Sequence, residues 1–318
     1  MLIYLLITHV LLPLVLIVWL GLCTGNRGKF WLFRFGIVTA YCVFIAMVGV
    51  WGAISYYLPV LYALLYVSAV VRSYKKLRRN RRKRQRELIH HPQQATDDTE
   101  QYKQEKWVGT VKSSILVILL LLDGWVLWGY EPTQKAIELN FPLTGGIYYV
   151  WNGGHSPLIN QCPFYAKQHY GLDIVKLNRA GVSTRSVPAG KLVSFEIFGE
   201  IVRSPCDGTV VNVVAGKNDH LQTGKLRELD TGNMVALQCA GVTLYFLHLQ
   251  FGSVTVKPGQ ILNEGEQLGL VGNSGDSLEP HLHIHGEIGG KTGEIFSGKS
   301  VPLRFNGRYL VRNSLVWR

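Results

Sequence analysis

The chain has 318 residues, 47% of them hydrophobic and 17% charged, and a formal net charge of +12. This length allows a membrane region with one folded domain, or two soluble domains, and a mean hydropathy of +0.14 is high for a soluble protein. The charge is local: residues 72–86 hold ten Lys or Arg and no acidic residue, whereas residues 131–318 hold 17 basic and 15 acidic residues. This distribution argues against a nucleic-acid partner and favours a basic cytoplasmic anchor beside a membrane.

The N-terminal half is predicted to be an α-helical membrane region with about four spans, since one helix needs about 20 apolar residues to cross a bilayer. Residues 2–22 form the first apolar run. The next apolar stretch, residues 35–72, is about twice the required length, so we expect two spans that turn near residues 52–57. Residues 108–129 form the fourth apolar run.

These runs set the predicted domain boundaries. They are three spans in residues 1–72, a basic and then polar cytoplasmic loop in 73–107, a fourth span in 108–130, and a folded domain in 131–318. Loops rich in Lys and Arg stay in the cytoplasm, so the C-terminal domain is expected on the outside of the membrane. The lipid bilayer is therefore a predicted partner, and His9 and Asp123 within apolar runs are expected to be hydrogen-bonded and to reach interfacial water, respectively.

From residue 131 onward the chain is rich in Gly and in short runs of β-branched and aromatic residues. Two such runs, residues 234–239 and 242–249, are separated by Ala240 and Gly241, which is typical of a hairpin. Little of this region has helical periodicity. We therefore expect an all-β, mainly antiparallel domain of sandwich or barrel type.

The five cysteines do not form a C-x-x-C pair, so a structural zinc knuckle or a thioredoxin-like motif is not supported. Three of them, Cys162, Cys206 and Cys239, lie in the distal domain. If that domain is outside the cell, two of the three can pair, with Cys206 and Cys239 as one choice. Buried free thiols are the other possibility.

Two motifs in the distal domain predict a metal centre. Alternate side chains of an extended strand share a face, so His281, His283 and His285 point the same way. The segment His169-Tyr-Gly-Leu-Asp173 places an imidazole and a carboxylate four residues apart, and its glycine allows a tight turn. A catalytic zinc keeps three protein ligands and an open position for water. We therefore predict one Zn²⁺ ion held by His169, Asp173 and His283, and a zinc hydrolase.

Other histidines are assigned by their positions. His281 lies beside the predicted ligand His283, and His248 follows Phe246 at a strand end, so both are expected to move protons and to stabilise an oxyanion. His285 is expected to support the ligand His283. The remaining two, His155 and His220, lie in loops and are expected to be solvated.

These motifs belong to a longer series in a fixed order. The series is His169–Asp173, Ser204–Val211, Gly232–Asn233, His248–Leu249, Val256–Gly259, Glu264–Gly265, Leu268–Gly269, Gly272–Gly275 and Pro280–His285. Over about residues 163–287 it resembles the lysostaphin/LytM-type zinc metallopeptidases that cut peptidoglycan peptides, with their duplicated hybrid motif fold. The resemblance implies zinc ligands at His169, Asp173 and His283, and catalytic action of His248 and His281 on water and the tetrahedral intermediate.

The resemblance implies a membrane-anchored zinc metalloendopeptidase that hydrolyses peptide bonds of cell-wall peptidoglycan. Its location would be the bacterial inner or plasma membrane, multi-pass, with the C-terminal domain outside. Two features depart from the family pattern: an insertion from Leu177 to Val202, and His285 where an aromatic or acidic residue is commoner. The multi-span N-terminal half lies outside the resemblance.

Three other interpretations concern parts of the sequence. The domain is alternatively a non-catalytic wall-binding or regulatory module on the same fold, or an appendage to a membrane half that acts as a channel, transporter or sensor. The run Gly293–Ser300 satisfies the phosphate-loop pattern, but Val301-Pro302 follows where that loop needs a helix. No nucleotide partner is therefore expected, and the oligomeric state is left open.

Overall fold

The structure, a computed structural model, describes residues 2–22, 28–90, 97–162, 168–185, 190–221 and 230–318. The chain forms two compact units. The first comprises Met1–Gly49 and Tyr57–Trp125, and the second comprises Val50–Tyr56 and Val126–Arg318. The start of the predicted motif region, residue 163, lies outside the described residues.

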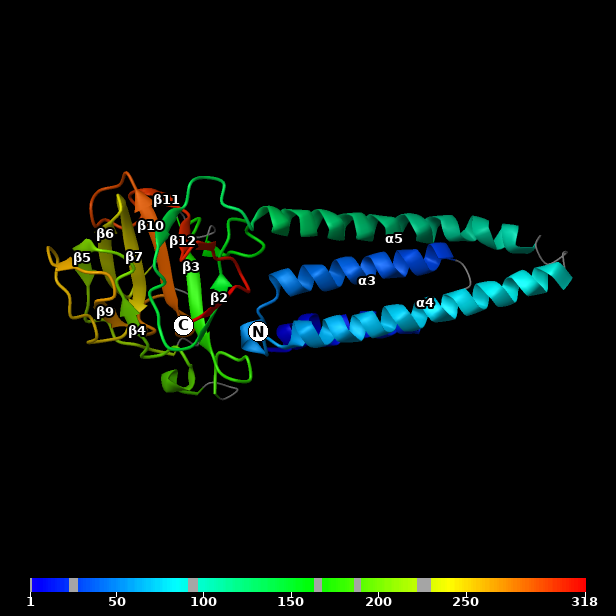
Figure 1. Cartoon of the computed structure of the whole chain (residues 1–318), viewed down its shortest axis with the longest axis horizontal. Helices are drawn as coiled ribbons and strands as arrows, with labels where there is room; N and C mark the ends of the chain where they lie inside the picture. Colours follow the sequence, from blue (N-terminus) through cyan, green and yellow to red (C-terminus); the bar gives the residue numbers. More distant parts are fainter. Residues whose placement is uncertain (1, 23–27, 91–96, 163–167, 186–189, 222–229) are drawn as a thin grey trace. The chain divides into compact units, whose positions relative to one another are not determined.

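The first unit is helical, as the blue and cyan part of Figure 1 shows. Its elements are α1 (Leu2–Leu5), a π-helical segment η1 (Leu6–Leu11), α2 (Leu12–Gly21), α3 (Gly28–Val48), α4 (Leu58–His90) and α5 (Asp97–Trp128), whose last residues belong to the second unit. Helices α2 and α3 carry Leu, Val, Ile and aromatic side chains on every face, so neither has a polar side.

Two helical segments, Ile3–Gly21 and Phe30–Val48, are long and apolar enough to cross a membrane. The apolar end of α5, Ser113–Trp128, is shorter than these two. Within the described part of the chain, two of the four expected spans therefore meet the requirements of length and composition. The apolar start of α4 does not, because the helix passes directly into the basic run at 72–86.

The region expected to be a basic and then polar loop, residues 73–107, is helical at both ends. Helix α4 carries the basic run as far as His90, since Lys and Arg are good helix formers, and α5 begins at Asp97. The predicted turn near residues 52–57 lies between α3 and α4, where Trp51–Ala53 form the short 3₁₀ helix η2.

The ionisable groups expected within the apolar runs are both buried. The ring of His9 hydrogen-bonds through Nδ1 to the Thr8 hydroxyl at 2.7 Å, and the Tyr62 hydroxyl donates to the His9 carbonyl at 2.9 Å. Asp123 is 7% exposed. The hydrogen-bonded His9 agrees with the expectation, whereas Asp123 is more enclosed than a carboxylate that reaches interfacial water.

The second unit is a β-domain built on one large sheet. Its strands are β1 (Ile137–Leu139), β2 (Ile147–Asn152), β3 (Leu172–Leu177), β4 (Ile201–Arg203), β5 (Gly208–Val214), β6 (Asn233–Cys239), β7 (Val242–Leu249), β8 (Ile261–Leu262), β9 (Gln267–Leu270), β10 (Leu282–Ile288), β11 (Lys299–Val301), β12 (Leu303–Phe305), β13 (Arg308–Tyr309) and β14 (Leu315–Trp317). The main sheet has the order β14-β2-β3-β10-β7-β6-β5-β8, with β11 also paired to β10. All its pairs are antiparallel, which confirms the predicted mainly antiparallel β-domain.

Apolar side chains from the central strands form one continuous core, to which β10 contributes Leu282 and Ile284 and β7 contributes Phe246. Cys206 and Cys239 form a disulfide that joins the entry of β5 to the end of β6. Of the two possibilities left open by the sequence, the disulfide is therefore the one that the structure contains.

The register of the central strands determines which polar side chains meet. Figure 1 shows β3, β10, β7 and β6 as neighbours, and the ladder pairs Asp173 of β3 directly with His283 of β10. On its other side His283 pairs with Leu247 of β7, so His248 at the end of that strand lies beside the same position. A strand alternates its faces, so His283, His285 and Glu287 share one side of β10.

Candidate metal centre

Asp173 and His283 form the centre of the site. The ring Nδ1 of His283 lies 2.7 Å from Asp173 Oδ1, and the Asn152 amide donates to the other carboxylate oxygen at 2.6 Å. Burial alone would raise the pKa of Asp173. The interactions with His281 and His283 outweigh burial and hold this pKa below its usual range, so the carboxylate is charged at neutral pH.

His281 faces the same carboxylate from the start of β10. Its Nδ1 hydrogen-bonds to the Glu279 carbonyl at 2.8 Å and to the Ser277 hydroxyl at 3.1 Å, and its Nε2 lies 3.5 Å from Asp173 Oδ1. A carbonyl oxygen can only accept, so Nδ1 carries the proton. Nε2 is therefore the nitrogen directed at the site.

His248 has the same arrangement on β7. Its Nδ1 donates to the Ser274 carbonyl at 2.9 Å, and its ring centroid lies 4.9 Å from that of His281 and 6.2 Å from that of His283. Burial, followed by the neighbouring imidazoles, lowers the pKa of His248 to about 3. The ring is thus neutral at physiological pH and offers an unprotonated Nε2.

The backbone of His248 is strained in a way that is typical of functional positions. Its φ of 62° is in the left-handed region, which non-glycine residues seldom adopt and which costs on the order of 1–3 kcal/mol. The amide of Gly272 donates to the His248 carbonyl at 3.1 Å, and the His248 amide donates to Thr231 at 3.2 Å. These two bonds hold the ring of His248 against the site.

A chain of buried hydrogen bonds supports His283 from behind. His283 Nε2 lies 3.1 Å from His285 Nδ1, and His285 Nε2 lies 3.1 Å from Glu287 Oε1. Glu287 also accepts from the amides of Phe296 at 2.8 Å and Gly298 at 2.9 Å. Burial alone would raise the pKa of Glu287, but these donors lower it, so the carboxylate is charged and fixes the proton of His285 on Nε2.

This series of hydrogen bonds bears on whether a cation fits the site. If Glu287 accepts from His285 Nε2, then His285 Nδ1 must accept from His283 Nε2. The 2.7 Å between His283 Nδ1 and the Asp173 carboxylate then requires a positive charge between the two atoms, either a proton on Nδ1 or a bound cation. An imidazole and a carboxylate that meet in this way are both ligands of Zn²⁺, so these residues fit a divalent metal ion.

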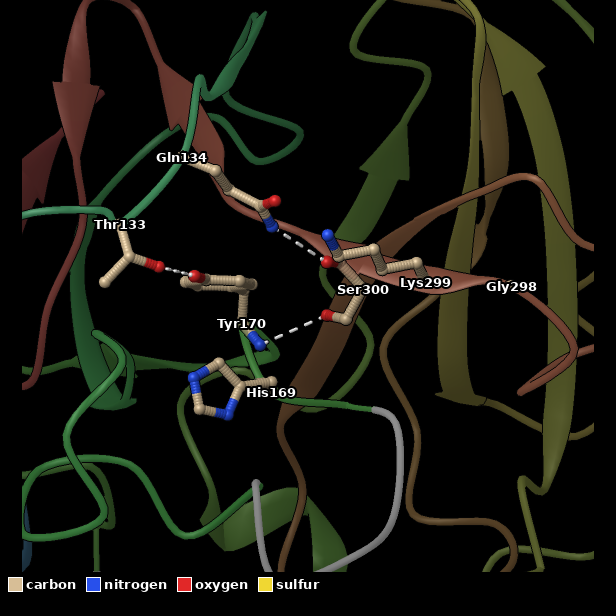
Figure 2. Close-up of a pocket in the computed structure, with 7 residues that line it drawn as sticks. All are labelled: Thr133, Gln134, His169, Tyr170, Gly298, Lys299 and Ser300. Carbon is tan, nitrogen blue, oxygen red and sulfur yellow. Dashed lines mark hydrogen bonds between the residues drawn. The ribbon is translucent and has the colours of Figure 1, made fainter.

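His169, the third ligand expected from the sequence, is not brought into this group. It is exposed in the turn before β3 and lines a cavity of about 620 Å³. Figure 2 shows its ring beside Tyr170, whose amide donates to the Ser300 hydroxyl at 3.2 Å. The cavity is lined by Thr133, Gln134, His169, Tyr170, Gly298, Lys299 and Ser300.

Cys162 is the residue that sequence reasoning missed. Within the described residues, Cys162, Asp173 and His283 are the group whose potential ligand atoms all lie within 4.8 Å of one another. The Sγ atom of Cys162 is 3.9 Å from Asp173 Oδ2, and the side chain is buried. A thiol, a carboxylate and an imidazole are all ligands that Zn²⁺ accepts.

The two histidines expected to be solvated differ in burial. His155 is 2% exposed and packs edge-on against Trp128, with the ring centroids 4.1 Å apart. His220 is partly exposed in its loop. The backbone at Gly129 also lies close to Ser156, since a Cβ atom at residue 129 would lie 2.4 Å from the Ser156 Cβ, and no local sequence pattern indicates such a contact.

Residues 188–294 match the model of peptidase family M23. The chain therefore contains a peptidase family M23 domain, and the matched range includes His248, His281 and His283. The segment that carries His169 and Asp173 precedes the matched range. No curated protein matches the chain.

Solved structures show limited similarity. A candidate peptidase M23 of Pseudomonas aeruginosa is 20% identical over 49% of this chain and 46% of its own, with a TM-score of 0.28. The catalytic domain of lysostaphin from Staphylococcus simulans is 18% identical over 36% of this chain and 80% of its own, with a TM-score of 0.24. A zinc-containing peptidase of Vibrio cholerae is 20% identical over 50% and 36%, with a TM-score of 0.25. The chain spans under half of the Pseudomonas and Vibrio proteins, and the family assignment rests on the family model.

Proposed function

We propose that the protein is a membrane-anchored zinc metalloendopeptidase that hydrolyses peptide bonds in cell-wall peptidoglycan. The observation that carries this proposal is the meeting of Asp173 and His283, with ligand atoms 2.7 Å apart, beside His248 and His281 within a family M23 domain. In this proposal Asp173, His283 and His169 would hold one zinc ion. A bound zinc ion supplies Lewis acidity that activates water and polarises the scissile carbonyl.

The two remaining histidines handle protons in this proposal. His248 and His281 each donate Nδ1–H to a backbone carbonyl, which leaves Nε2 free to accept a proton from water or to donate one to the leaving amine. The low pKa of His248, about 3, keeps this ring in the accepting form. Once protonated, either ring can hydrogen-bond to the oxyanion of the tetrahedral intermediate.

We also propose that the first unit anchors the domain in the bacterial inner or plasma membrane, with four crossings and the β-domain outside. Two helical segments have the length and composition of a span, and the disulfide between Cys206 and Cys239 favours an oxidising compartment. Residues 50–56, between α3 and α4, pack within the β-domain unit. In this proposal the α3–α4 connection lies on the same side of the membrane as the domain, and the basic run of α4 lies on the other.

The test is hydrolysis of purified cell walls by the full chain in detergent, with released muropeptides identified by mass spectrometry. Asp173→Ala and His283→Ala are expected to abolish hydrolysis and to lower the bound zinc, because each removes a ligand. His248→Ala and His281→Ala are expected to lower the rate by about 10²–10⁴-fold with less loss of zinc, because they remove proton transfer. His220→Ala is the control, and full activity of both ligand variants contradicts the proposal.

A non-catalytic wall-binding or regulatory module is the second candidate. The position of His169 outside the ligand group favours it, because a peptidase of this kind needs a third ligand that leaves water access. The zinc content of the purified full chain separates the two. A folded protein that contains no zinc and binds walls without cleaving them is the expected outcome for this module.

A further inference from the structure

We propose that Cys162 is an alternative metal ligand, and that the conformation described here is a resting state in which its thiolate takes the place of His169. The inference deepens the proposed function, and its statements about hydrolysis rest on that function. In both states Asp173 and His283 hold the ion. In the resting state the third ligand is sulfur from Cys162, and in the hydrolytic state it is nitrogen from His169.

The geometry supports Cys162 in three ways. Its Sγ lies 3.9 Å from Asp173 Oδ2, within the group whose ligand atoms are all at most 4.8 Å apart. Its backbone amide donates to Asn160 Oδ1 at 3.0 Å, and the Asn160 amide in turn donates to the Gly171 carbonyl at 3.0 Å. Cys162 is therefore fixed to the entry of β3, the strand that carries Asp173.

Gly171 is the residue that lets the thiol and the imidazole approach each other. A Cβ atom at this position would lie 3.0 Å from His283 Cε1 and 3.2 Å from Cys162 Cβ. Both contacts are tighter than ordinary van der Waals contact, so any side chain here would push the thiol and the imidazole apart. The glycine of the sequence motif thus serves the cluster with Cys162 as well as the turn with His169.

The charges explain why a thiolate favours a resting state. One thiolate, one carboxylate and one neutral imidazole cancel the two positive charges of zinc, whereas two imidazoles and a carboxylate leave one positive charge. A less positive site is a weaker Lewis acid towards water. The Asn152 side chain lies between Asp173 and a cation. It accepts from the buried Arg312 guanidinium at 2.6 Å and donates to Asp173 at 2.6 Å. The nearby positive charge of Arg312 offsets the cost of placing two anions together.

His169 has room to exchange with Cys162. It is exposed in a turn closed by the Gly171 amide donating to the Gln168 carbonyl at 2.8 Å. Its ring faces the cavity shown in Figure 2 and is not packed in the core. A rotation of this short turn replaces the sulfur ligand by the imidazole, without movement of the paired strands that hold Asp173 and His283.

The experiment uses the full chain in detergent with Cys23 and Cys42 replaced by serine, so that Cys162 is the remaining free thiol beside the disulfide. The protein is loaded with Co²⁺, whose bond to a thiolate gives an intense charge-transfer band in the near ultraviolet. We expect this band in the parent protein and in His169→Ala, and its loss in Cys162→Ser. Zinc affinity is expected to fall by about 10- to 100-fold in Cys162→Ser, as for residues that support a metal site.

Wall hydrolysis is measured on the same samples. Cys162→Ser is expected to hydrolyse walls faster than the parent, and His169→Ala is expected to be inactive. A cobalt-loaded parent protein without the sulfur band overturns the inference, even if it hydrolyses walls. A sulfur band in a protein that never hydrolyses walls sustains the thiolate ligand and contradicts the peptidase proposal, so the two failures are distinguishable.

Discussion

At the scale of single residues, the site consists of common polar side chains, and the fold determines which nitrogen of its histidine rings carries the proton. The backbone carbonyls of Ser274 and Glu279 fix the protons of His248 and His281 on Nδ1. Glu287 fixes the proton of His285 on Nε2, one residue further from the metal centre. The protein thereby determines which nitrogen of each ring faces the site, which free imidazoles in water would not.

The buried carboxylate of Glu287 gives the first prediction. Glu287→Gln keeps the shape of the side chain but removes the charge that holds the proton on His285 Nε2. Without that charge, His285 no longer holds the proton of His283 on Nε2, so Nδ1 of His283 is less available to a metal ion. We expect zinc affinity to fall by about 10- to 100-fold, measured by competition with a chromophoric chelator. Glu294→Gln is the matched control, because Glu294 is exposed and pairs with Lys291 at the surface.

A purely structural role for Glu287 would give a different result. The nitrogen chemical shifts of the histidine rings report which nitrogen carries the proton. In the metal-free full chain, Glu287→Gln is expected to change the shifts of His285 and His283 and to leave those of His248 unchanged, because His248 is fixed by Ser274. If zinc affinity falls while every ring keeps its protonation pattern, Glu287 acts through stability alone.

At the scale of elements, the loops between strands position the catalytic histidines as much as the strands do. The turn at Gly272–Gly275 presents the Ser274 carbonyl to His248. It lies so close to the entry of β6 that a Cβ atom on Gly275 would be 2.2 Å from the Gly232 amide nitrogen, and Gly275 has a φ of 73°. Only glycine satisfies both conditions.

The second prediction follows from this contact. Gly275→Ala is expected to displace the Ser274 carbonyl and to lower the rate of wall hydrolysis by about 10²-fold, the order of effect that a misplaced catalytic group produces. Zinc content should change little, because neither Asp173 nor His283 touches this turn. Gly190→Ala is the control, since a Cβ there meets nothing within 4 Å. Equal effects of both substitutions would contradict a positioning role for the turn.

The elements differ in how well the sequence predicts them. Alternation and turn residues predict the β7 hairpin and the shared face of His281 and His283, because these depend on local periodicity. The exposed position of His169 and the closeness of Cys162 to Asp173 lie in the connection before β3, for which the sequence has no periodic signal. The basic run of α4 is helical and not a loop for a related reason: its charge marks it as exposed to water, but its Lys and Arg residues also favour helix.

At the scale of the whole molecule, a short segment far away in sequence completes the β-domain. Trp51, between α3 and α4, is 1% exposed, and its amide donates to the Tyr149 hydroxyl of β2 at 3.0 Å. The amide of Ser183 donates to the Gly52 carbonyl at 2.8 Å. Residues 50–56 therefore pack against β2 and the segment after β3, although residues 57–125 separate them in sequence from the rest of the domain.

This covering segment leads to the third prediction. Trp51→Ala is expected to destabilise the β-domain by about 3–5 kcal/mol, the usual cost of removing a buried tryptophan side chain, measured as thermal unfolding of the full chain in detergent micelles. Trp317→Ala is the matched control: its side chain is 66% exposed on β14, so its effect should stay within about 0.5 kcal/mol. A β-domain that starts at residue 126 lacks residues 50–56 and is expected to unfold at a lower temperature than the full chain. Addition of a peptide with the sequence of residues 50–56 should restore part of the loss, whereas equal stability of the cut domain and the full chain would show that the segment contributes nothing to the fold.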